Sequence, residues 1–345
     1  MQASTDLFAQ QEANRKASRR LVIGFVIFVA WLGFGGDIIW YLASSREAVA
    51  RAAEGLSANA VHHFPGLGIL LLAVALVIIW WAFAFGSAQI ISSTGAREIT
   101  APTTAAESQL VNIVDEMSIA SGVPRPRIWI IPDDAPNALT TGIDAASAQL
   151  AVTQGLLDGY SRDELQAVIG HEMGHIANLD VRLMTLLTAL VGLVAFVHGA
   201  TFRVMRFGGM RGGGRSGSRS RGGGGAGGVL IIVLAVVWVI SWLIAPLVTR
   251  FVVMRVGRSR EFLADAMSAQ YTRNPGALAD ALDKISRSTA VSDAIPSSSA
   301  QLCIMDPSSS DRSERRGRWA DLMATHPPVA ERVERLRQMA YQSVA

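Results

Sequence analysis

The chain has 345 residues, and its 31 basic and 28 acidic side chains give a formal net charge of only +3. That surplus is too small to argue for a stable nucleic-acid partner. Half of the residues are apolar and the mean hydropathy is +0.32, which is unusual for a soluble protein. The single cysteine, Cys303, excludes an internal disulfide and a metal site built from several cysteines.

Four apolar stretches are long enough to cross the hydrocarbon core of a bilayer, which needs about 20 helical residues. They are Leu21 to Trp40, Ile69 to Ile91, Leu183 to Phe202 and Val229 to Val248. We interpret residues 21–95 as two transmembrane anchors that follow a polar N-terminal tail, residues 1–20. Four basic residues precede the first anchor, so the positive-inside bias places the N-terminus in the cytoplasm; they are Arg15, Lys16, Arg19 and Arg20.

The region 183–250 contains the third and fourth hydrophobic segments, separated by a Gly/Arg-rich tract at 207–228. That composition predicts a disordered loop. If both segments span, the basic loop lies outside the cytoplasm, against the usual charge bias. Either the two segments form a re-entrant or membrane-surface hairpin, or coupling to the folded domain overrides the bias.

The two remaining regions, 96–182 and 251–345, have the composition of a soluble domain and are predicted to be two halves of one α+β catalytic domain with a small β-sheet. The first half predicts a helix through Glu107 to Met117, strands at 127–131 and 149–153, and a helix from Ser161 to about Ile176. Ser161 and Glu164 form a capping-box pattern at the start of that last helix. The second half predicts a helix from Arg260 to about Arg287, a Ser-rich loop to Ala300, and an amphipathic helix after Pro328.

The sequence His171-Glu172-Met173-Gly174-His175 matches the H-E-x-x-H pattern on the predicted helix. Two histidines four residues apart lie on one helix face, one turn apart, where one zinc ion can bind both. Glu172 lies beside them and is placed to take a proton from a water activated by the metal. His171 and His175 are therefore predicted metal ligands, and Glu172 the predicted catalytic base.

A catalytic zinc needs a third protein ligand and an open fourth position. Glu261 is the first acidic residue after the fourth hydrophobic segment, and Asp265 follows it by one helical turn. We predict that Glu261 completes the ligand set for one zinc ion per chain. Asp265 is predicted to accept a hydrogen bond from the distal nitrogen of a ligand histidine, His171, and so to fix its tautomer.

Several segments together resemble the HtpX family of heat-shock membrane proteases, which is related to the type I CAAX prenyl endopeptidases. They are residues 171–180 (HEMGHIANLD), residues 259–265 (SREFLAD), the pair Asn137-Ala138, and residues 325–328 (THPP) with 331–333 after them. The resemblance implies a mainly α-helical integral membrane protein with a zincin-like (gluzincin) catalytic domain and four hydrophobic helices. It also implies a zinc-dependent endopeptidase of the cell inner membrane, with its active site facing the cytoplasm, that acts in the stress response on damaged or misassembled membrane proteins.

The resemblance also implies a substrate-binding strand near Asn137 and Ala138. For His326 two roles remain open: a donor to the oxyanion of the tetrahedral intermediate, or a structural turn that leads into the last helix. Asn178 and Asp180 are expected either to lie behind the metal ligands as supporting groups or to cap the junction with the next hydrophobic helix.

Two other functions fit parts of the sequence. In the first, the chain is a membrane scaffold with a structural metal site, whose Gly/Arg-rich tract binds nucleic acid or anionic lipid. A structural zinc, however, is usually closed by four protein ligands, whereas three are found here. In the second, the chain is a prenyl-protein peptidase, which is expected to have more than four membrane spans.

Overall fold

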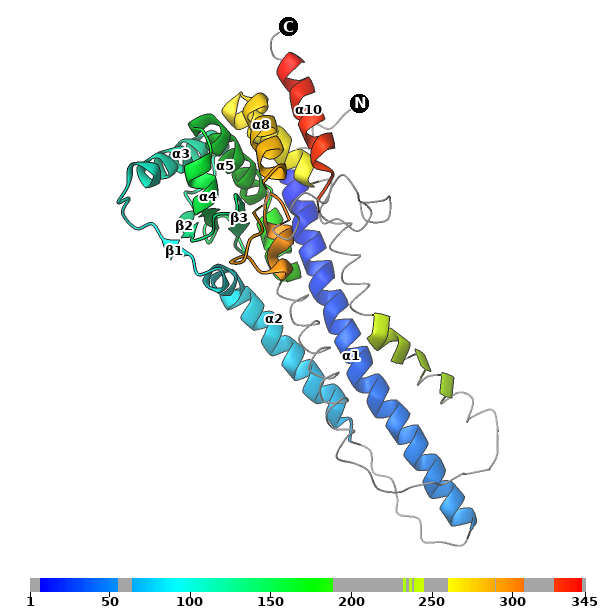
Figure 1. Cartoon of the computed structure of the whole chain (residues 1–345). Helices are drawn as coiled ribbons and strands as arrows, with labels where there is room; N and C mark the ends of the chain where they lie inside the picture. Colours follow the sequence, from blue (N-terminus) through cyan, green and yellow to red (C-terminus); the bar gives the residue numbers. More distant parts are fainter. Residues whose placement is uncertain are drawn as a thin grey trace. The chain divides into compact units, whose positions relative to one another are not determined.

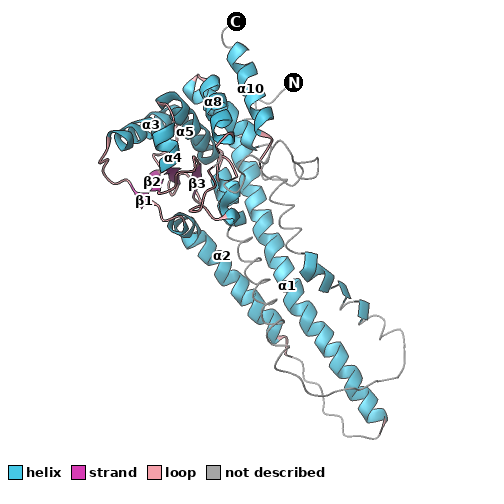
Figure 2. Cartoon of the chain, in the orientation of Figure 1, coloured by secondary structure: helices cyan, strands magenta, loops and turns pink. Residues whose placement is uncertain are grey.

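The structure is a computed structural model that describes residues 7–54, 64–188, 232–233, 236–237, 239–244, 260–288, 290–306 and 326–342. The described part is mainly helical and contains one small four-stranded sheet (Figures 1 and 2). Most of the third and fourth hydrophobic segments and the whole of the 207–228 tract lie outside the described residues. The predictions made for them are therefore not addressed by the structure.

The chain divides into two compact units. One contains residues 1–19, 82–191 and 250–345, and the other contains residues 20–81 and 192–249. Both predicted halves of the catalytic domain fall in the first unit, which we call the catalytic unit.

Helices α1 (Leu7–Ala53) and α2 (Gly66–Ser93) each contain a stretch long and apolar enough to cross a membrane. These stretches coincide with the first two predicted anchors. Helix α1 is longer than the predicted segment Leu21 to Trp40, because it includes residues assigned to the polar tail and continues beyond Trp40 to Ala53. Both extensions contain several Ala and Arg residues and no Pro, and Ala and Arg favour helix.

Asp37 explains how a carboxylate is accommodated within the first hydrophobic segment. Its side chain accepts hydrogen bonds from the backbone N–H groups of Gly68, at 2.7 Å, and Leu67, at 3.4 Å. These are among the unpaired donors of the first turn of α2, where a negative charge is favoured by the helix dipole. Gly33 and Gly68 lie so close that a Cβ on Gly33 would be 2.7 Å from the Cα of Gly68.

We expect Asp37→Ala to lower the thermal unfolding temperature of the protein in detergent micelles, because loss of a helix cap costs about 1 kcal/mol. Asp37→Asn keeps an oxygen acceptor and should lose less. Unfolding of the alanine variant at the wild-type temperature would show that this cap contributes nothing.

The sheet lies in the catalytic unit and has the order β1-β2-β4-β3. Strand β2 (Arg127–Ile131) pairs in parallel with β4 (Gln149–Thr153), which confirms both predicted strands. The short β1 (Arg97–Glu98) pairs antiparallel with β2, and β3 (Ala138–Thr141) pairs antiparallel with β4 at the opposite edge. Every residue of β3 and β4 is buried.

Helices cover the sheet and form the apolar core with it. Helix α3 (Ala105–Ser121) and the short α4 (Gln154–Gly159) precede α5 (Arg162–Ala177), and α3 packs along α5 (Figure 1). The capping box at Ser161 and Glu164 is confirmed, since each side chain bonds the backbone of the other residue. The core contains Leu110, Ile113, Leu150, Leu165 and Ile169, all fully buried.

The second half of the unit differs from the sequence prediction in one respect. The single helix expected from Arg260 to about Arg287 is two helices, residues 260–272 and α8 (Pro275–Ser286). The break occurs where Arg273 adopts a left-handed φ of 52° and Asn274 caps α8 through the N–H of Ala277. Pro275 at the first helical position removes the backbone donor that a continuous helix would need.

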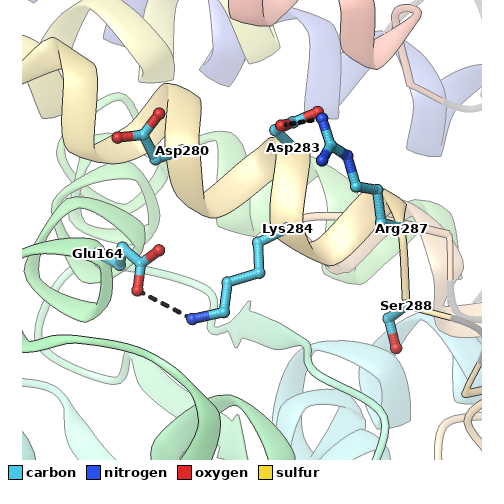
Figure 3. A pocket seen from close by; sticks show the side chains of 6 residues that line it. All are labelled: Glu164, Asp280, Asp283, Lys284, Arg287 and Ser288. Carbon is cyan, nitrogen blue, oxygen red and sulfur yellow. Dashed lines mark hydrogen bonds and ion pairs between the residues drawn. The ribbon is translucent and has the colours of Figure 1, made fainter.

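The Ser-rich region expected to be a loop ends in a 3₁₀ helix, η1 (Ser297–Leu302), which extends past Ala300. The last helix, α10 (Val329–Gln342), begins directly after Pro328 as predicted and packs against α8. A surface depression near α5 and α8 is lined by charged side chains that pair with one another (Figure 3): Lys284 with Glu164, and Arg287 with Asp283. Such exposed pairs contribute little to stability.

Candidate metal centre

Helix α5 places His171, Glu172 and His175 at the centre of the catalytic unit. The Nε2 atoms of His171 and His175 lie 3.2 Å apart, with the two rings at right angles. His171 and Glu172 are almost fully buried, and His175 is largely buried. The i, i+4 spacing thus brings two imidazole nitrogens to one point inside the protein, as the sequence predicts.

Glu261 comes to the same point from the helix at residues 260–272. Its Oε2 lies 3.6 Å from Nε2 of His171, and its Oε1 lies 3.6 Å from Nε2 of His175. One potential ligand atom from each of the three residues lies within 4.8 Å of the others. The carboxylate of Glu261, more than 80 residues from either histidine in the chain, therefore converges with the two imidazoles.

Two glycines explain how the two helices come so close. A Cβ on Gly174 would lie 3.3 Å from the Cα of Ala264, and one on Gly170 would lie 3.1 Å from the Oγ of Ser268. These glycines are four residues apart on the face of α5 that meets the helix at 260–272. Small residues on this face let the backbones approach, which brings Glu261 within reach of the histidines.

We expect Gly174→Val to weaken metal binding, because the added methyl groups must push Ala264 and its helix away from α5. Overpacking of this kind costs about 1–3 kcal/mol. Metal content per chain and thermal unfolding measure the two effects. Gly159→Ala is the matched control, since a Cβ at Gly159 meets nothing within 4 Å; equal metal content in both variants would contradict the packing argument.

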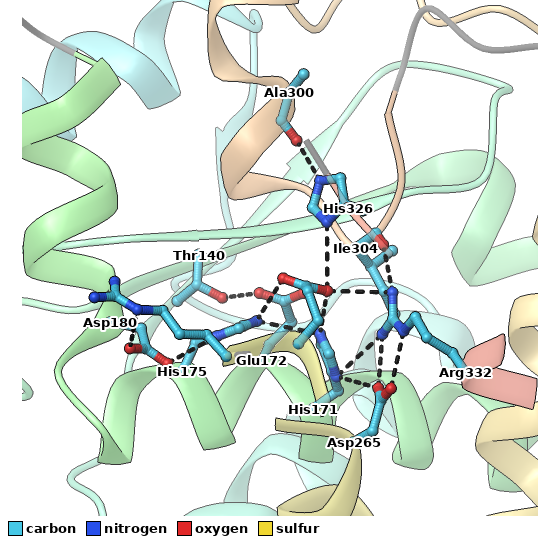
Figure 4. Close-up of polar contacts among 12 residues, drawn as sticks. Thr140, His171, Glu172, His175, Asp180, Asp265, Ala300, Ile304, His326 and Arg332 are labelled. Atoms are coloured by element: carbon cyan, nitrogen blue, oxygen red, sulfur yellow. Dashed lines mark hydrogen bonds and ion pairs between the residues drawn. The ribbon is translucent and has the colours of Figure 1, made fainter. Parts of the chain in front are cut away.

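Each histidine is held from behind by a carboxylate. Nδ1 of His171 lies 2.9 Å from Oδ1 of Asp265, and Nδ1 of His175 lies 3.2 Å from Oδ2 of Asp180 (Figure 4). In each case Nδ1–H donates a hydrogen bond to the carboxylate, which fixes the orientation of the ring with Nε2 turned toward the metal site. Asp265 thus occupies the position predicted for it, and Asp180 makes an equivalent contact to the second histidine.

Arg332 of α10 is the cation on which these acids depend. It is 1% exposed, and its guanidinium donates to both oxygens of Asp265, at 2.7 and 2.9 Å. Its Nη1 also lies 3.2 Å from Oε2 of Glu261 and donates to the carbonyl of Ile304 (Figure 4). A buried arginine paired in this way offsets the cost of enclosing two carboxylates without water.

Glu172 is oriented from the sheet. Thr140 of the edge strand β3 donates its hydroxyl hydrogen to Oε2 of Glu172, while Oε1 has no hydrogen-bond partner among the described residues (Figure 4). The carboxylate is therefore fixed by one oxygen, and the other is available to a reacting group. A small cavity beside Glu172 and His175 is lined by Val181, Met184 and Leu302, among others.

The donor set suits a zinc ion. Oε2 of Glu261 is buried and accepts no hydrogen bond within the described part of the chain, although the nitrogens of His171, His326 and Arg332 lie 3.2–3.6 Å away. Arg332 balances the charge of this carboxylate, but Oε2 keeps lone pairs that no hydrogen bond uses and that a metal ion can occupy. Two neutral imidazoles and one carboxylate are a known ligand set of catalytic zinc sites, which keep a fourth position open.

His326 and Asn178 lie near the site with other contacts. Nε2 of His326 donates to the carbonyl of Ala300 at 3.0 Å, and its Nδ1 lies 3.4 Å from Oε2 of Glu261. Asn178 ends α5 as its C-cap residue, and its side chain contacts the sulfur of Met267. Both residues therefore lie beside the proposed metal ligands. The side chain of His326 contacts Ala300 and Glu261, and that of Asn178 contacts Met267.

The predicted substrate-binding pair lies at the edge of the sheet, next to β3. There the chain already pairs with itself: Ile304 donates its N–H to the carbonyl of Ala138 at 2.9 Å, and Leu139 bridges Cys303. Asn137 donates its side-chain amide to the carbonyl of Met305. Residues 303–305 therefore cover the part of the edge that the sequence assigns to substrate.

The electrostatics of the centre favour a proton on His175. Burial lowers the pKa of His175, but the hydrogen bond to Asp180 and the negative charge of Glu261 outweigh it and raise the pKa to about 9. Burial raises the pKa of Glu261, whereas the charges of His326 and Arg332 oppose this and hold the pKa well below its ordinary value. At neutral pH the site thus contains the ionised carboxylate of Glu261 beside the protonated ring of His175.

We expect the apparent zinc affinity to rise with pH up to about 9 and then to level off, because zinc must displace the proton on His175. Competition with a chromophoric chelator between pH 6 and 10 measures this. Asp180→Asn removes a charge that stabilises the protonated ring and should move the rise to lower pH. If the zinc affinity, corrected for the chelator, stays constant from pH 6 to 10, zinc does not displace a proton from His175, and the prediction is wrong.

Comparison with known proteins agrees with this site. Residues 104–340 match the model of peptidase family M48. The chain is 33% identical over 334 residues to a protease HtpX homolog of Streptococcus gordonii, and 34% identical over 335 residues to one of Streptococcus pneumoniae. A homolog from Listeria innocua is 34% identical over 334 residues. In each case the match covers 96% of this chain and 100% of the relative.

The crystal structure of Ste24p from S. mikatae is also similar, with a TM-score of 0.47 and 17% sequence identity over 92% of this chain and 66% of that chain. The site and the family match together define a metallopeptidase. The chain belongs to peptidase family M48, and within it resembles the HtpX proteases.

Four residues that contact the site were given no role from the sequence: Thr140 and Arg332, and also Asn14 and Arg260, which lie 2.7 and 3.4 Å from Oδ1 of Asp180. Only Arg332 carries a signal that could have found it. It is three residues after Val329 and four before Leu336, so it lies on the apolar face of α10. A charged residue on an apolar helix face indicates a buried ion pair.

Proposed function

We propose that the chain is a zinc-dependent endopeptidase of the cell inner membrane, with its active site on the cytoplasmic side, that cleaves damaged or misassembled membrane proteins. The proposal depends above all on one observation, the convergence of Nε2 of His171, Nε2 of His175 and the carboxylate of Glu261 beside Glu172. The catalytic unit would then be a zincin-like domain of the gluzincin kind, in which a glutamate is the third ligand.

The three converging residues would hold the zinc. When bound, zinc supplies Lewis-acid chemistry: it polarises the carbonyl of the scissile peptide and lowers the pKa of water. Glu172 takes the proton from the attacking water on its unpaired Oε1 and returns it to the nitrogen of the leaving amine. The bond from Thr140 holds the other oxygen of Glu172 and so fixes the direction from which the proton is exchanged.

His326 acts in this proposal either as a donor to the oxyanion of the tetrahedral intermediate or as a structural residue. A raised pKa, which arises because the negative charge of Glu261 outweighs the effect of burial, keeps the ring a donor. As an oxyanion donor it would have to release either the carbonyl of Ala300 or Glu261, which it now contacts. As a structural residue it keeps both contacts and joins η1 to the metal ligand.

Substrate binding is proposed at the edge of β3, where an extended peptide can add a strand through main-chain hydrogen bonds. Because residues 303–305 now pair with Ala138 and Leu139, a substrate strand must replace them there. The neighbouring cavity is lined in part by Val181 and by Met184, which is the second residue of the third hydrophobic segment. These apolar side chains adjoin the third hydrophobic segment in sequence, which supports substrates drawn from membrane proteins.

We expect Glu172→Gln to bind zinc as wild type does and to cleave casein in detergent about 10²–10⁴-fold more slowly, because the amide cannot accept the proton. Metal content per chain and the rate of casein cleavage, with and without chelator, are the measurements. Asp163→Asn, on the exposed first turn of the same helix, is the control. Cleavage by the Glu172 variant at the wild-type rate would remove the assigned base.

A further inference from the structure

The N-terminal turns of α1 belong to the catalytic unit and contact the metal centre from behind. Asn14 is only 2% exposed, although it precedes the first hydrophobic segment and lies among charged residues. Its side-chain nitrogen donates one hydrogen bond to the carbonyl of Asn178 and another to Oδ1 of Asp180, each at 2.7 Å. Both hydrogens of the carboxamide are used in these two bonds.

Asp180 is the carboxylate that holds His175. While Oδ1 accepts from Asn14, Oδ2 lies 3.2 Å from Nδ1 of His175. Asp180 is 1% exposed, and Nε of Arg260 lies 3.4 Å from its Oδ1. Leu179 has a left-handed φ of 58°, a conformation that bulky residues rarely adopt, and it turns the chain between α5 and the next helix.

The orientation of Asp180 therefore depends on few groups. Arg260 is at the limit of a direct contact, whereas Asn14 makes two short bonds that join Asp180 to the end of α5 through the carbonyl of Asn178. A carboxylate that supports a metal-binding histidine must itself be held, since otherwise the ring can rotate or change tautomer. Among the described residues, Asn14 is the side chain that donates a short hydrogen bond to Oδ1 of Asp180.

We propose that Asn14 is a positioning residue of the metal site, which acts through Asp180 on His175. The inference rests on the proposed zinc site and adds to it a group from the N-terminal end of the first membrane anchor. The carboxamide matters because it supplies two donors: an alanine supplies none, and an aspartate would place a second carboxylate against Asp180. Residues ahead of the first hydrophobic segment are then part of the catalytic apparatus.

The test uses the full-length protein in detergent with Asn14→Ala and Asn14→Asp. We expect zinc affinity, measured by chelator competition, to fall about 10- to 100-fold in Asn14→Ala, the range seen when partners of metal ligands are removed. The fall should be larger in Asn14→Asp. The d–d absorption of the cobalt-substituted protein should change, and kcat should fall more than KM.

Ser18→Ala is the matched control, because Ser18 is buried on the same helix but only donates to the backbone carbonyl of Asn14. A double-mutant cycle with Asp180→Ala separates positioning from folding: the effect of Asn14→Ala on zinc affinity should vanish once Asp180 is absent. Should Asn14→Ala fail to fold, Asn14→Ser, which retains one donor, replaces it in the same cycle.

Wild-type zinc affinity and an unchanged cobalt spectrum in Asn14→Ala overturn the inference, and so does an equal effect of Asn14→Ala with and without Asp180. Either result leaves the proposed function intact if Glu172→Gln still binds zinc without cleaving casein. If the wild-type protein binds no zinc and cleaves nothing, the proposed function fails as well.

Discussion

The metal centre depends on a buried balance of charge between Arg332 and the two acids Asp265 and Glu261. Neither acid is accessible to water, and enclosing an unpaired carboxylate costs several kcal/mol. The guanidinium forms a two-pronged bond with Asp265 and lies beside Glu261, so one cation compensates for both acids. Because Asp265 also bonds His171, a single carboxylate connects Arg332 to this proposed metal ligand. The C-terminal helix α10 is therefore needed to build the site, although the H-E-x-x-H pattern itself lies on α5.

The same centre needs two helices to pack closer than ordinary side chains allow. Gly170 and Gly174 leave room on α5 for the backbone near Ala264 and Ser268. In water a glycine within a helix costs about 1 kcal/mol relative to alanine. Here that cost is offset by the approach of Glu261, which could not reach both histidines from a greater distance. Local helix stability is given up for a shorter distance between ligands, as is common at functional sites.

The sequence predicted the parts of the site whose signals are local. The histidine spacing, the capping box at Ser161 and the acid pair at Glu261 and Asp265 lie within short stretches with a helical period. The strands at 127–131 and 149–153 were likewise marked by local alternation and turn residues. Asn14 and Arg332 were missed or given no role, because their partners lie more than 60 residues away and only the fold brings them together. The break at Arg273 was missed because a left-handed residue of this type leaves no pattern beyond the proline two positions later.

The two histidines are supported from opposite ends of the chain, and this has a consequence for how the site is assembled. His171 is held by Asp265 and, through it, by Arg332 of the last helix, whereas His175 is held by Asp180 and, through it, by Asn14 of the first helix. All the hydrophobic segments lie between Asn14 and Arg332 in sequence. Before these segments have reached their final positions, one or both rings lack their supporting carboxylate or its partner. The proposed metal site is therefore complete only when both ends of the chain have packed against α5.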